Sequence, residues 1–459
     1  MKLNRRNVLA GAMALSLPRF AVAQVAGEVV LTADKSAMPI LTQGGAKTSV
    51  WRFMKEQPIA VLHAKQGQEL KGRIINHLDE EIWLHWFGVR GPSAMMTLNV
   101  LPGDANAVAF DFTPPDAGTF WFGPMTHASQ QRDMGLYGML IVEEATPLAP
   151  AFNDVPLIFD DWMIDDKGRQ QGKFGDLEMA IGEGRLGDWF TVNGAFKSKI
   201  KVTLNKPLRL RLLNAANARV MSIMFKGASP LVMALDGQPT AFKPIVETGL
   251  KLLPGQRADL LLTEMSPEVA IALDVLDDVM DVAFLQVSGV NISDQVADNF
   301  KLPANPLIEL GDLTTARHIP IEIAGGAKGG LQSAKVGDST MDMRGLLEKG
   351  LAWAFNGIAG VGGPPLFSAK KGETLILEFS NKTSFPQPLH IHGHVWKLME
   401  SDGQAVEDSV WMDTAVVPGL SAAKLAFVAD NLGLWGLQSL IAERVDAGLI
   451  GAFSVLDAA

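Results

Sequence analysis

The residues best suited to carry chemistry in this chain are its histidines, of which there are only eight. Three of them lie in one short run, His390-Ile391-His392-Gly393-His394. Alternate side chains of a β-strand point to the same face, so we expect His390 and His392 to lie side by side. Two imidazoles on one face are a common beginning of a copper, zinc or nickel site. The same spacing is also compatible with polar side chains that only fill a strand.

The remaining histidines have no obvious partner in the sequence. His85 stands in "WLHWFG" and His127 in "FGPMTHASQQ", and each taken alone predicts a hydrogen-bonded histidine at a domain edge. His63, His77 and His318 receive no role. The chain has no cysteine, which excludes disulfides, a thiolate nucleophile and a thiolate metal ligand.

Short alternating strands must position these residues. Runs such as "LRLRLL", "TLILEF" and "KLAFVA" are separated by turn residues at intervals typical of β-sandwiches. A weak internal repeat indicates several such units, because the Gly-to-Asn spacing of residues 67–76 recurs at 372–381, with a shorter relative in "KPLRLRLLNAAN". We therefore predict an all-β protein of three β-sandwich domains, at 24–147, 148–305 and 306–459.

The first 23 residues have the features of an export signal. Asn4-Arg5-Arg6-Asn7 contains a twin arginine, a short apolar stretch follows, and Ala21-Val22-Ala23 is a small-x-small cleavage site. These features predict a twin-arginine (Tat) signal at 1–23 and a mature protein that is exported folded to the periplasm. The apolar stretch is too short to span a bilayer, and no other segment is long and apolar enough.

The net charge of −10 argues against nucleic acid as a partner. The signal itself carries basic residues and no acidic one, so the mature chain is more acidic still. An acidic surface repels phosphate backbones, and the sequence has no basic run that would hold anionic lipid. We therefore expect no nucleic-acid partner and no membrane span.

Nearly the whole mature chain resembles the bacterial multicopper oxidases of the three-cupredoxin-domain, laccase-like type. The resemblance is carried by "PDAGTFWF", "GLYGMLIVEE", "RLRLLNAANAR" and "LLPGQRADLLL", and most densely by "PLFSAKKGETLILEFSNKTSFPQPLHIHGHVWKLM", "DTAVVPG" and "FVADNLGLWGLQSLIAERVDAGLIGAFSV". It implies three cupredoxin-like Greek-key β-sandwich domains. In such oxidases a blue copper takes electrons from a substrate, and a three-copper cluster between the first and third domains reduces dioxygen to water.

Applied position by position, the resemblance indicates that most copper ligands of the family are replaced here. Of the first motif, H-W-H-G, one histidine remains, and both histidines of the second, W-Y-H-x-H, are replaced. The third, H-P-x-H-x-H-G, keeps two histidines, and the fourth, H-C-H with a later histidine and an axial residue, keeps neither its histidines nor its cysteine. The residues that stand at these ligand positions are Phe87, Gly123, Met125, Gln387, Gln438, Ser439, Leu440, Arg444 and Leu449.

The blue-copper positions are the most altered in this comparison. Blue copper needs a thiolate with two imidazoles, whereas Ser439 carries a hard, protonated hydroxyl. Arg444 adds a positive charge where a cation would bind, which is costly in a low-dielectric pocket. Aromatic and aliphatic residues at the three-copper positions predict a cavity that has been filled. Laccase-type oxidation is therefore not expected.

Three histidines keep ligand positions of the family. His85 and His390 match the two ligands of the cluster's single outlying copper, and His392 matches a neighbouring ligand. One hypothesis is a mononuclear copper or zinc site at the interface of domains 1 and 3, where the Met125 thioether would suit Cu(I). The other is that His85 and His390 only hydrogen-bond across the interface and hold the domains together.

The sequence leaves alternative functions open. The first is a copper-free, non-catalytic relative of the oxidases, a periplasmic structural or binding protein with an unknown protein or cell-envelope partner. A periplasmic cell-division protein that has this fold without the coppers is a precedent, by analogy of fold only. The second is a metal-binding protein with one Cu or Zn ion at the three histidines. A third is an oxidoreductase of multicopper oxidase type that uses unusual ligands.

Overall fold

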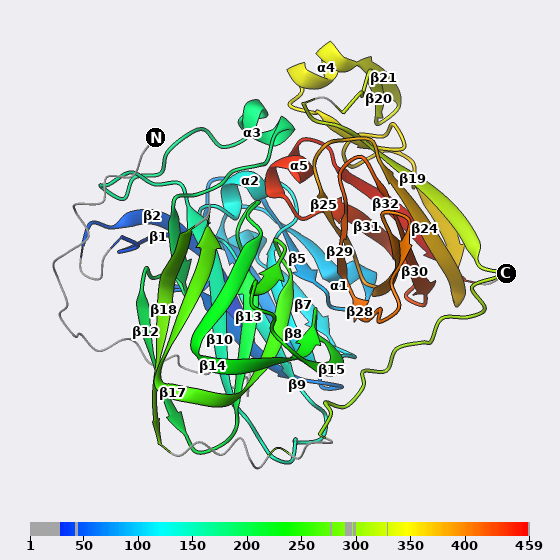
Figure 1. The fold of residues 1–459 in the computed structure, drawn as a ribbon. Helices are drawn as coiled ribbons and strands as arrows, with labels where there is room; N and C mark the ends of the chain where they lie inside the picture. Colours follow the sequence, from blue (N-terminus) through cyan, green and yellow to red (C-terminus); the bar gives the residue numbers. More distant parts are fainter. Residues whose placement is uncertain are drawn as a thin grey trace.

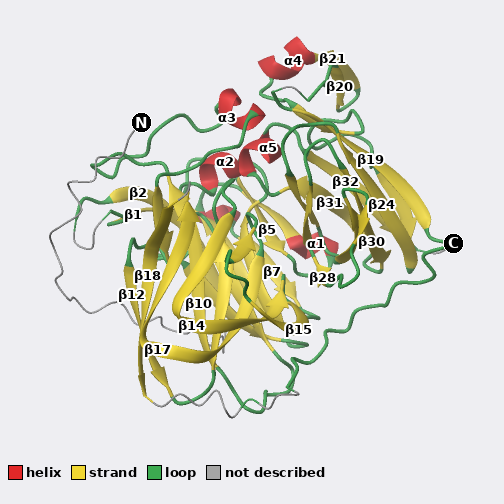
Figure 2. Ribbon diagram, in the orientation of Figure 1, coloured by secondary structure: helices red, strands yellow, loops and turns green. Residues whose placement is uncertain are grey.

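Strands arranged in layers make up most of the structure, and the helices are short (Figure 1, Figure 2). The computed structural model describes residues 28–41, 45–275, 278–289, 296, 300–327 and 329–457. The export signal predicted at 1–23 lies outside these residues. Within them, no helix has the length and apolar character needed to cross a membrane. The predicted all-β class is confirmed.

The first group of strands, within residues 29–143, forms two sheets that share one core. One sheet has the spatial order β2 (Thr48–Arg52), β1 (Val29–Met38), β4 (Leu70–Asn76) and β7 (Val108–Phe112). The other has the order β3 (Ala60–Lys65), β9 (Gly138–Glu143), β8 (Gly118–Pro124), β5 (Ile82–Phe87) and β6 (Thr97–Val100). The connections contain α1 (Ser93–Met96), η1 (Asp104–Asn106) and α2 (Ala128–Gln131). Trp86 joins the sheets, because its ring centroid lies 5.1 Å from those of both Phe110 and Phe122.

The middle group, within residues 153–289, forms one nine-stranded sheet. Its main path is β11 (Trp189–Val192), β10 (Asn153–Trp162), β13 (Leu208–Asn214), β17 (Arg257–Val275), β14 (Met221–Leu235) and β15 (Gln238–Pro244). Beside this path lie β12 (Ser198–Leu204), β16 (Leu250–Leu252) and β18 (Asp278–Gly289), and α3 (Leu177–Ile181) lies in a connection. The first part of β17 pairs with β13 and its second part with β18. Gly227, with a φ of +86°, lies at a register shift of β14, where glycine adopts a backbone conformation that other residues rarely reach.

The third group, within residues 317–456, again contains two large sheets. One comprises β22 (Trp353–Phe355), β19 (Arg317–Gly325), β24 (Glu373–Asn381), β30 (Ala422–Ala429), β26 (Trp396–Ser401), β27 (Gln404–Ala405) and β28 (Trp411–Met412). The other has the order β23 (Phe367–Lys370), β32 (Ile450–Leu456), β31 (Gly433–Ser439), β25 (Gln387–Ile391) and β29 (Thr414–Val417). The small pair β20 (Ser333–Val336) and β21 (Ser339–Asp342) and the helices α4 (Met343–Glu348) and α5 (Ala442–Asp446) complete this group.

Burial along the strands follows the two-residue period of a β-strand. In β12 every second residue is buried, and β4 shows nearly the same pattern. β13 differs, because all of its residues are buried, Arg209 and Arg211 included. The guanidinium nitrogens of these two arginines lie 2.6 Å and 3.2 Å from Asp259 Oδ2. The alternation in "LRLRLL" therefore belongs to a strand that is buried on both faces.

The internal repeat in the sequence has a structural counterpart at the ends of three strands. Asn76, Asn214 and Asn381 end β4, β13 and β24, and all three are buried. Each side-chain oxygen accepts a hydrogen bond from the backbone N–H two residues later. Each side-chain amide donates to backbone carbonyl oxygens beyond the strand. The three groups of strands thus share one way of closing a strand.

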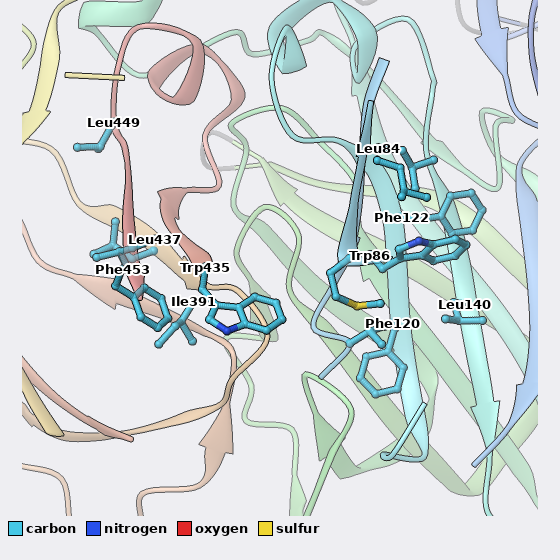
Figure 3. Packing of buried hydrophobic residues seen from close by; sticks show 14 of the residues in the cluster. Leu84, Trp86, Phe120, Phe122, Leu140, Ile391, Trp435, Leu437, Leu449 and Phe453 are labelled. Atoms are coloured by element: carbon cyan, nitrogen blue, oxygen red, sulfur yellow. The ribbon is translucent and has the colours of Figure 1, made fainter. Parts of the chain in front are cut away.

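The three groups meet in a shared hydrophobic interior. One cluster of buried residues draws on the first and third groups, and Figure 3 shows part of it: Leu84, Trp86, Phe120, Phe122 and Leu140 from the first, and Ile391, Trp435, Leu437, Leu449 and Phe453 from the third. A smaller cluster contains residues of all three groups, among them Trp121, Leu213 and Leu440. The domain boundaries predicted near 147 and 305 fall between the groups and stay predictions.

Helices α2 and α5 lie side by side where the three groups meet (Figure 1). The Asp446 carboxylate of α5 accepts hydrogen bonds from the backbone N–H groups of Ala128 (3.0 Å) and Ser129 (2.8 Å) at the start of α2. Glu443 of α5 accepts a hydrogen bond of 2.8 Å from the amide of Asn217 in the middle group. Helix α5 thereby ties the three groups together.

Buried acidic side chains surround this junction. Asp133 pairs with Arg185 at 2.9 Å, and Asp160 accepts a 2.6 Å hydrogen bond from the Tyr137 hydroxyl. Burial raises the pKa of Asp133 to about 7, although the charge of Arg185 acts in the opposite direction. Burial likewise raises the pKa of Asp160 well above its ordinary value. Between the ordinary pKa of an aspartate and these raised pKa values, the folded protein keeps protons on Asp133 and Asp160 that the unfolded chain would release.

We expect the contribution of Asp133 to stability to fall as pH rises from about 4 to about 7. Its folded pKa of about 7 exceeds the ordinary value of 3.8, so the folded state binds the proton more tightly and gains stability from it at low pH. The decrease should approach about 1.4 kcal/mol per pH unit. Urea unfolding of the wild type and of Asp133→Asn, followed across this range, measures it. The variant should show the shallower decline, and equal pH slopes in the two proteins would contradict the expectation.

Candidate metal centre

The structure brings His85, His390 and His392 together at one buried point. His85 lies on β5 of the first group, whereas His390 lies on β25 of the third group and His392 directly follows that strand. The rings of His85 and His392 stack with their centroids 3.9 Å apart, and the ring of His390 lies 5.2 Å from that of His392. One nitrogen of each ring lies within 4.8 Å of those of the other two. Their role as metal ligands stays a prediction.

Interior strands hold the three histidines in place. β25 is paired on both sides, with β29 and with β31, and all of its residues are buried. β5 lies between β6 and β8 and is almost entirely buried. Because both strands lie inside their sheets, these imidazoles have little freedom to move apart.

His390 is oriented by Asp413, the residue before β29. Its Nδ1 lies 3.1 Å from the backbone oxygen of Asp413 and 3.1 Å from Oδ1 of the same residue. Both oxygens are acceptors, so Nδ1 carries the proton and donates it. His390 Nε2 is buried and has no hydrogen-bond partner among the described residues. The lone pair of the neutral ring therefore lies on the nitrogen that the protein leaves unpaired.

The other two imidazoles also have polar partners. His85 Nδ1 lies 2.8 Å from the hydroxyl oxygen of Thr97, and its Nε2 is buried with no partner in the described part of the chain. His392 Nε2 donates to the side-chain oxygen of Gln438 at 3.0 Å. Unpaired buried nitrogens on two neighbouring rings are an unusual arrangement, because buried polar atoms are normally hydrogen-bonded.

Burial keeps two of these rings neutral. It lowers the pKa of His85 and of His392 well below the ordinary value of 6.5, and the neighbouring imidazoles shift both pKa values in the same direction. Neutral imidazole is the form that binds metal ions. His85 and His392 are therefore in the protonation state of a ligand at neutral pH.

The remaining histidines lie elsewhere. His394, the third of the H-x-H-x-H run, donates from Nδ1 to the backbone oxygen of His392 at 2.9 Å and packs among aromatic rings. His127 is exposed at the start of α2, and His63, His77 and His318 lie beside carboxylates. Within the described ranges, only His85, His390 and His392 form a group with metal-ligand spacing.

Hydrophobic side chains occupy the space beside the three histidines. The ring of Phe87 stacks on that of Trp121, with centroids 3.8 Å apart and planes 6° from parallel, and it also lies 4.7 Å from the ring of His85. Leu440 packs in the same cluster. Phe87 and Leu440 stand at two positions that the family resemblance assigns to histidine ligands. Both side chains are in packed apolar contact beside the histidine group.

Gly123 and Met125, the two ligand positions of the second motif, have different surroundings. At Gly123 an added Cβ would lie 3.1 Å from the Trp121 ring, so little room exists there for a larger side chain. Met125 is partly exposed, and its sulfur lies 3.9 Å from the hydroxyl of Thr97, which in turn contacts His85. The Met125 thioether is therefore linked to His85 by the Thr97 hydroxyl, which contacts both side chains.

Arg444, at a position that the family resemblance assigns to a blue-copper ligand, places a buried guanidinium there. Arg444 donates to the side-chain oxygen of Gln387 at 2.8 Å, to the backbone oxygen of Pro386 at 2.8 Å and to that of Gly182 at 3.0 Å. Its guanidinium carbon lies 4.9 Å from the centroid of the Trp353 ring. Burial lowers the pKa of Arg444 to about 10, so the group stays positively charged at neutral pH.

Ser439 and Leu449 have structural contacts at these positions. The Ser439 hydroxyl accepts a hydrogen bond of 3.1 Å from the backbone N–H of Ile441, at the start of α5. Leu449 is fully buried in the shared hydrophobic core. Gln438, at a cluster position, holds His392 as described above. The side chains here are engaged with the protein itself.

Comparison with known proteins places the chain in a family. Multicopper oxidase models match residues 36–147, 142–271 and 338–459. The chain belongs to the multicopper oxidase family. The crystal structure of a multicopper oxidase from Pseudomonas thermotolerans matches it with a TM-score of 0.79 at 26% identity, over 94% of this chain and 99% of that chain. The predicted cupredoxin-like β-sandwich fold is thereby confirmed.

Proteins similar to this chain carry different functional names. Multicopper oxidase MmcO of Mycobacterium tuberculosis is 25% identical over 436 residues, which are 85% of this chain and 80% of that protein. Cell division protein FtsP of Escherichia coli is 26% identical over 433 residues, which are 90% of this chain and 86% of that protein. Membership of the family alone therefore does not select one function for this chain.

The family's copper groups can be tested against the donors present. A blue copper needs a thiolate and two imidazoles, and Gln387, Ser439 and Arg444 offer neither kind of donor. The residues at these positions do not fit that group. The buried, unpaired nitrogens of His85 and His390 do fit one ion that prefers imidazole.

Sequence reasoning missed several residues that hold this centre. Asp413 and Arg257 lie within the quoted blocks "DTAVVPG" and "LLPGQRADLLL", but neither received a role. Thr97, which contacts His85, was missed as well. For Asp413 and Arg257 the only signal in the sequence was a single charged residue beside a largely apolar strand.

Replacing Arg444 by alanine should lower the free energy of unfolding by about 2 to 4 kcal/mol, since the buried Gln387 oxygen and two partly buried backbone oxygens would lose their donor. The matched control is Arg344→Ala, because Arg344 is 88% exposed and pairs only with Glu348 on the same helix. That change should cost less than about 0.5 kcal/mol. Chemical unfolding of both variants measures the difference. A near-neutral Arg444→Ala would show that the guanidinium does not stabilise this region.

Proposed function

We propose that this protein is a member of the multicopper oxidase family that does not oxidise substrates in the laccase manner and acts instead as a structural or binding protein of the cell envelope. The observation that carries the proposal is the contact between the Arg444 guanidinium and Gln387, at positions that the resemblance assigns to blue-copper ligands. A fixed positive charge at this point opposes the binding of a cation. Without a blue copper, a substrate has no site at which to deliver electrons.

The chemistry of the neighbouring side chains supports the same proposal. The chain has no cysteine, and the Ser439 hydroxyl accepts a hydrogen bond from the backbone N–H of Ile441. Phe87 stacks on Trp121 beside the three histidines, so apolar contact fills space that further metal ions would need. A pair or trio of coppers would lack ligands here. The donor set supports one ion at most.

The proposed location rests on sequence features and on similarity. The twin-arginine signal predicted at 1–23 favours export to the periplasm in a folded state. Similarity to FtsP, a protein named for cell division, favours a role at the cell envelope. The proposed partner is a protein or another envelope component, and no nucleic acid is expected because the chain is acidic.

Copper loading tests this proposal. Mature protein prepared with ample copper should carry no more than one copper per chain, show no thiolate-to-copper absorption, and leave a phenolic or diamine dye unoxidised. Elemental analysis, absorption spectroscopy and a dye assay measure these properties. A laccase-active family member prepared in parallel is the positive control. More than two coppers per chain together with dye turnover would end the proposal.

The convergence of His85, His390 and His392 favours a second candidate, a single copper or zinc site between the first and third groups of strands. The unpaired buried nitrogens of His85 and His390 are the specific observation, because unsatisfied buried acceptors are costly unless a ligand pairs with them. These histidines would hold the ion through neutral imidazole nitrogens. When bound, the ion would supply a cross-link between two parts of the chain and a centre for limited redox or Lewis-acid chemistry.

Metal titration tests the second candidate. The wild type should bind one Zn²⁺ or Cu⁺ ion more tightly than about micromolar and gain thermal stability from it by linkage. His390→Ala should lose both the binding and the gain in stability. His394→Gln is the matched control, because His394 is buried in the same H-x-H-x-H run but lies outside the group. Wild-type binding weaker than micromolar would contradict the site.

A further inference from the structure

His390 is held by a chain of buried charges that reaches into the middle group of strands. Its Nδ1 contacts the backbone oxygen and Oδ1 of Asp413, each at 3.1 Å. Asp413 in turn accepts hydrogen bonds from both terminal nitrogens of Arg257, with Nη1 2.9 Å from Oδ1. All three side chains are at most 1% exposed. Water therefore cannot replace any of these partners.

Arg257 is itself fixed from several directions. Its Nε donates to the backbone oxygen of Thr119 at 3.2 Å, in the first group. Asp236, in the middle group, accepts the backbone N–H of Arg257 at 3.0 Å through Oδ1 and that of Thr414 at 3.1 Å through Oδ2. The guanidinium thus contacts all three groups of strands. The position of the Asp413 carboxylate therefore depends on how the three groups of strands are placed around Arg257.

This arrangement decides which nitrogen of His390 can act as a ligand. A neutral imidazole has one N–H and one lone pair, and the partner of one nitrogen selects the tautomer. Both atoms near Nδ1 are acceptors, so the proton is retained there and the lone pair lies on Nε2. In metal sites such a carboxylate behind a histidine orients the ring and makes it a better ligand.

We infer that Asp413 and Arg257 are positioning residues that set the metal affinity of the centre, by holding His390 with its proton on Nδ1 and its free lone pair on Nε2. The inference rests on the single-metal function proposed above. It assigns to the middle group, which contributes no ligand, control over an ion bound between the other two. The ligand class is a borderline cation that prefers neutral imidazole, such as Zn²⁺ or copper.

Competition titration with Zn²⁺ tests the inference. Asp413→Asn should bind Zn²⁺ about 10- to 100-fold more weakly than the wild type, since a carboxylate that orients a metal-binding histidine typically has an effect of this size. Arg257→Lys keeps the charge but loses the two-pronged contact, so a smaller loss is expected and the variant serves if Asp413→Asn does not fold. Zn²⁺ affinity equal to that of the wild type in both variants would overturn the inference.

The matched control is Arg90→Gln. Arg90 also forms ion pairs of 2.8 Å, with Asp116 in its own group and with Asp430 in the third group, but it does not touch the three histidines. Its loss should leave Zn²⁺ affinity unchanged. An equal loss in Arg90→Gln and Asp413→Asn would mean that affinity follows general domain packing, which would also overturn the inference.

A metal-free measurement separates this inference from the function beneath it. Ring ¹⁵N NMR of His390 should show the Nδ1–H tautomer in the wild type and a mixture of tautomers in Asp413→Asn. A wild type with the proton on Nε2 would overturn the inference whatever the metal does. Wild-type protein that binds no Zn²⁺ would end the single-metal function and the control of affinity with it. Wild-type binding with an unaffected Asp413→Asn would end only the inference.

Discussion

The relative position of the three groups of strands depends on one buried guanidinium, that of Arg257. It is fully buried, and a charge in the protein interior is tolerated only when it is paired and hydrogen-bonded. Its partners are the backbone oxygen of Thr119, the carboxylate of Asp413 and the neighbouring Asp236. A shift of any one group would break at least one of these contacts. The point at which His85 meets His390 is therefore fixed together with the domain arrangement.

A second buried guanidinium has the opposite consequence for metal binding. Arg257 holds an acceptor behind His390, which is a candidate ligand, whereas Arg444 lies at a position that the family resemblance assigns to a blue-copper ligand and pairs with Gln387. Both charges are compensated by close contacts with oxygen atoms. Two arginines in one protein thus favour one candidate ion and oppose another, because charge and donor type act locally in a low-dielectric interior.

The multicopper oxidase family shows how one fold can support different functions. Helix α5 lies within the segment in which the family resemblance places copper ligands, and in this chain its Glu443 and Asp446 bind Asn217 and the start of α2. These contacts join the three groups whether or not a metal is present. The position of this helix is therefore explained by packing, and function has to be argued from the site.

The sequence by itself determined the strands, the repeated unit and the donors available, because these depend on local period, spacing and side-chain chemistry. The absence of cysteine limits metal ligands to imidazole, thioether and oxygen, and the two-residue period of a strand places His390 and His392 together. Only the tertiary structure decided that His85 stacks on His392, that Arg209 faces Asp259 instead of solvent, and that Asp413 and Arg257 hold His390. These contacts join residues far apart in the chain, and they arise from how the sheets pack against one another, which no local pattern encodes.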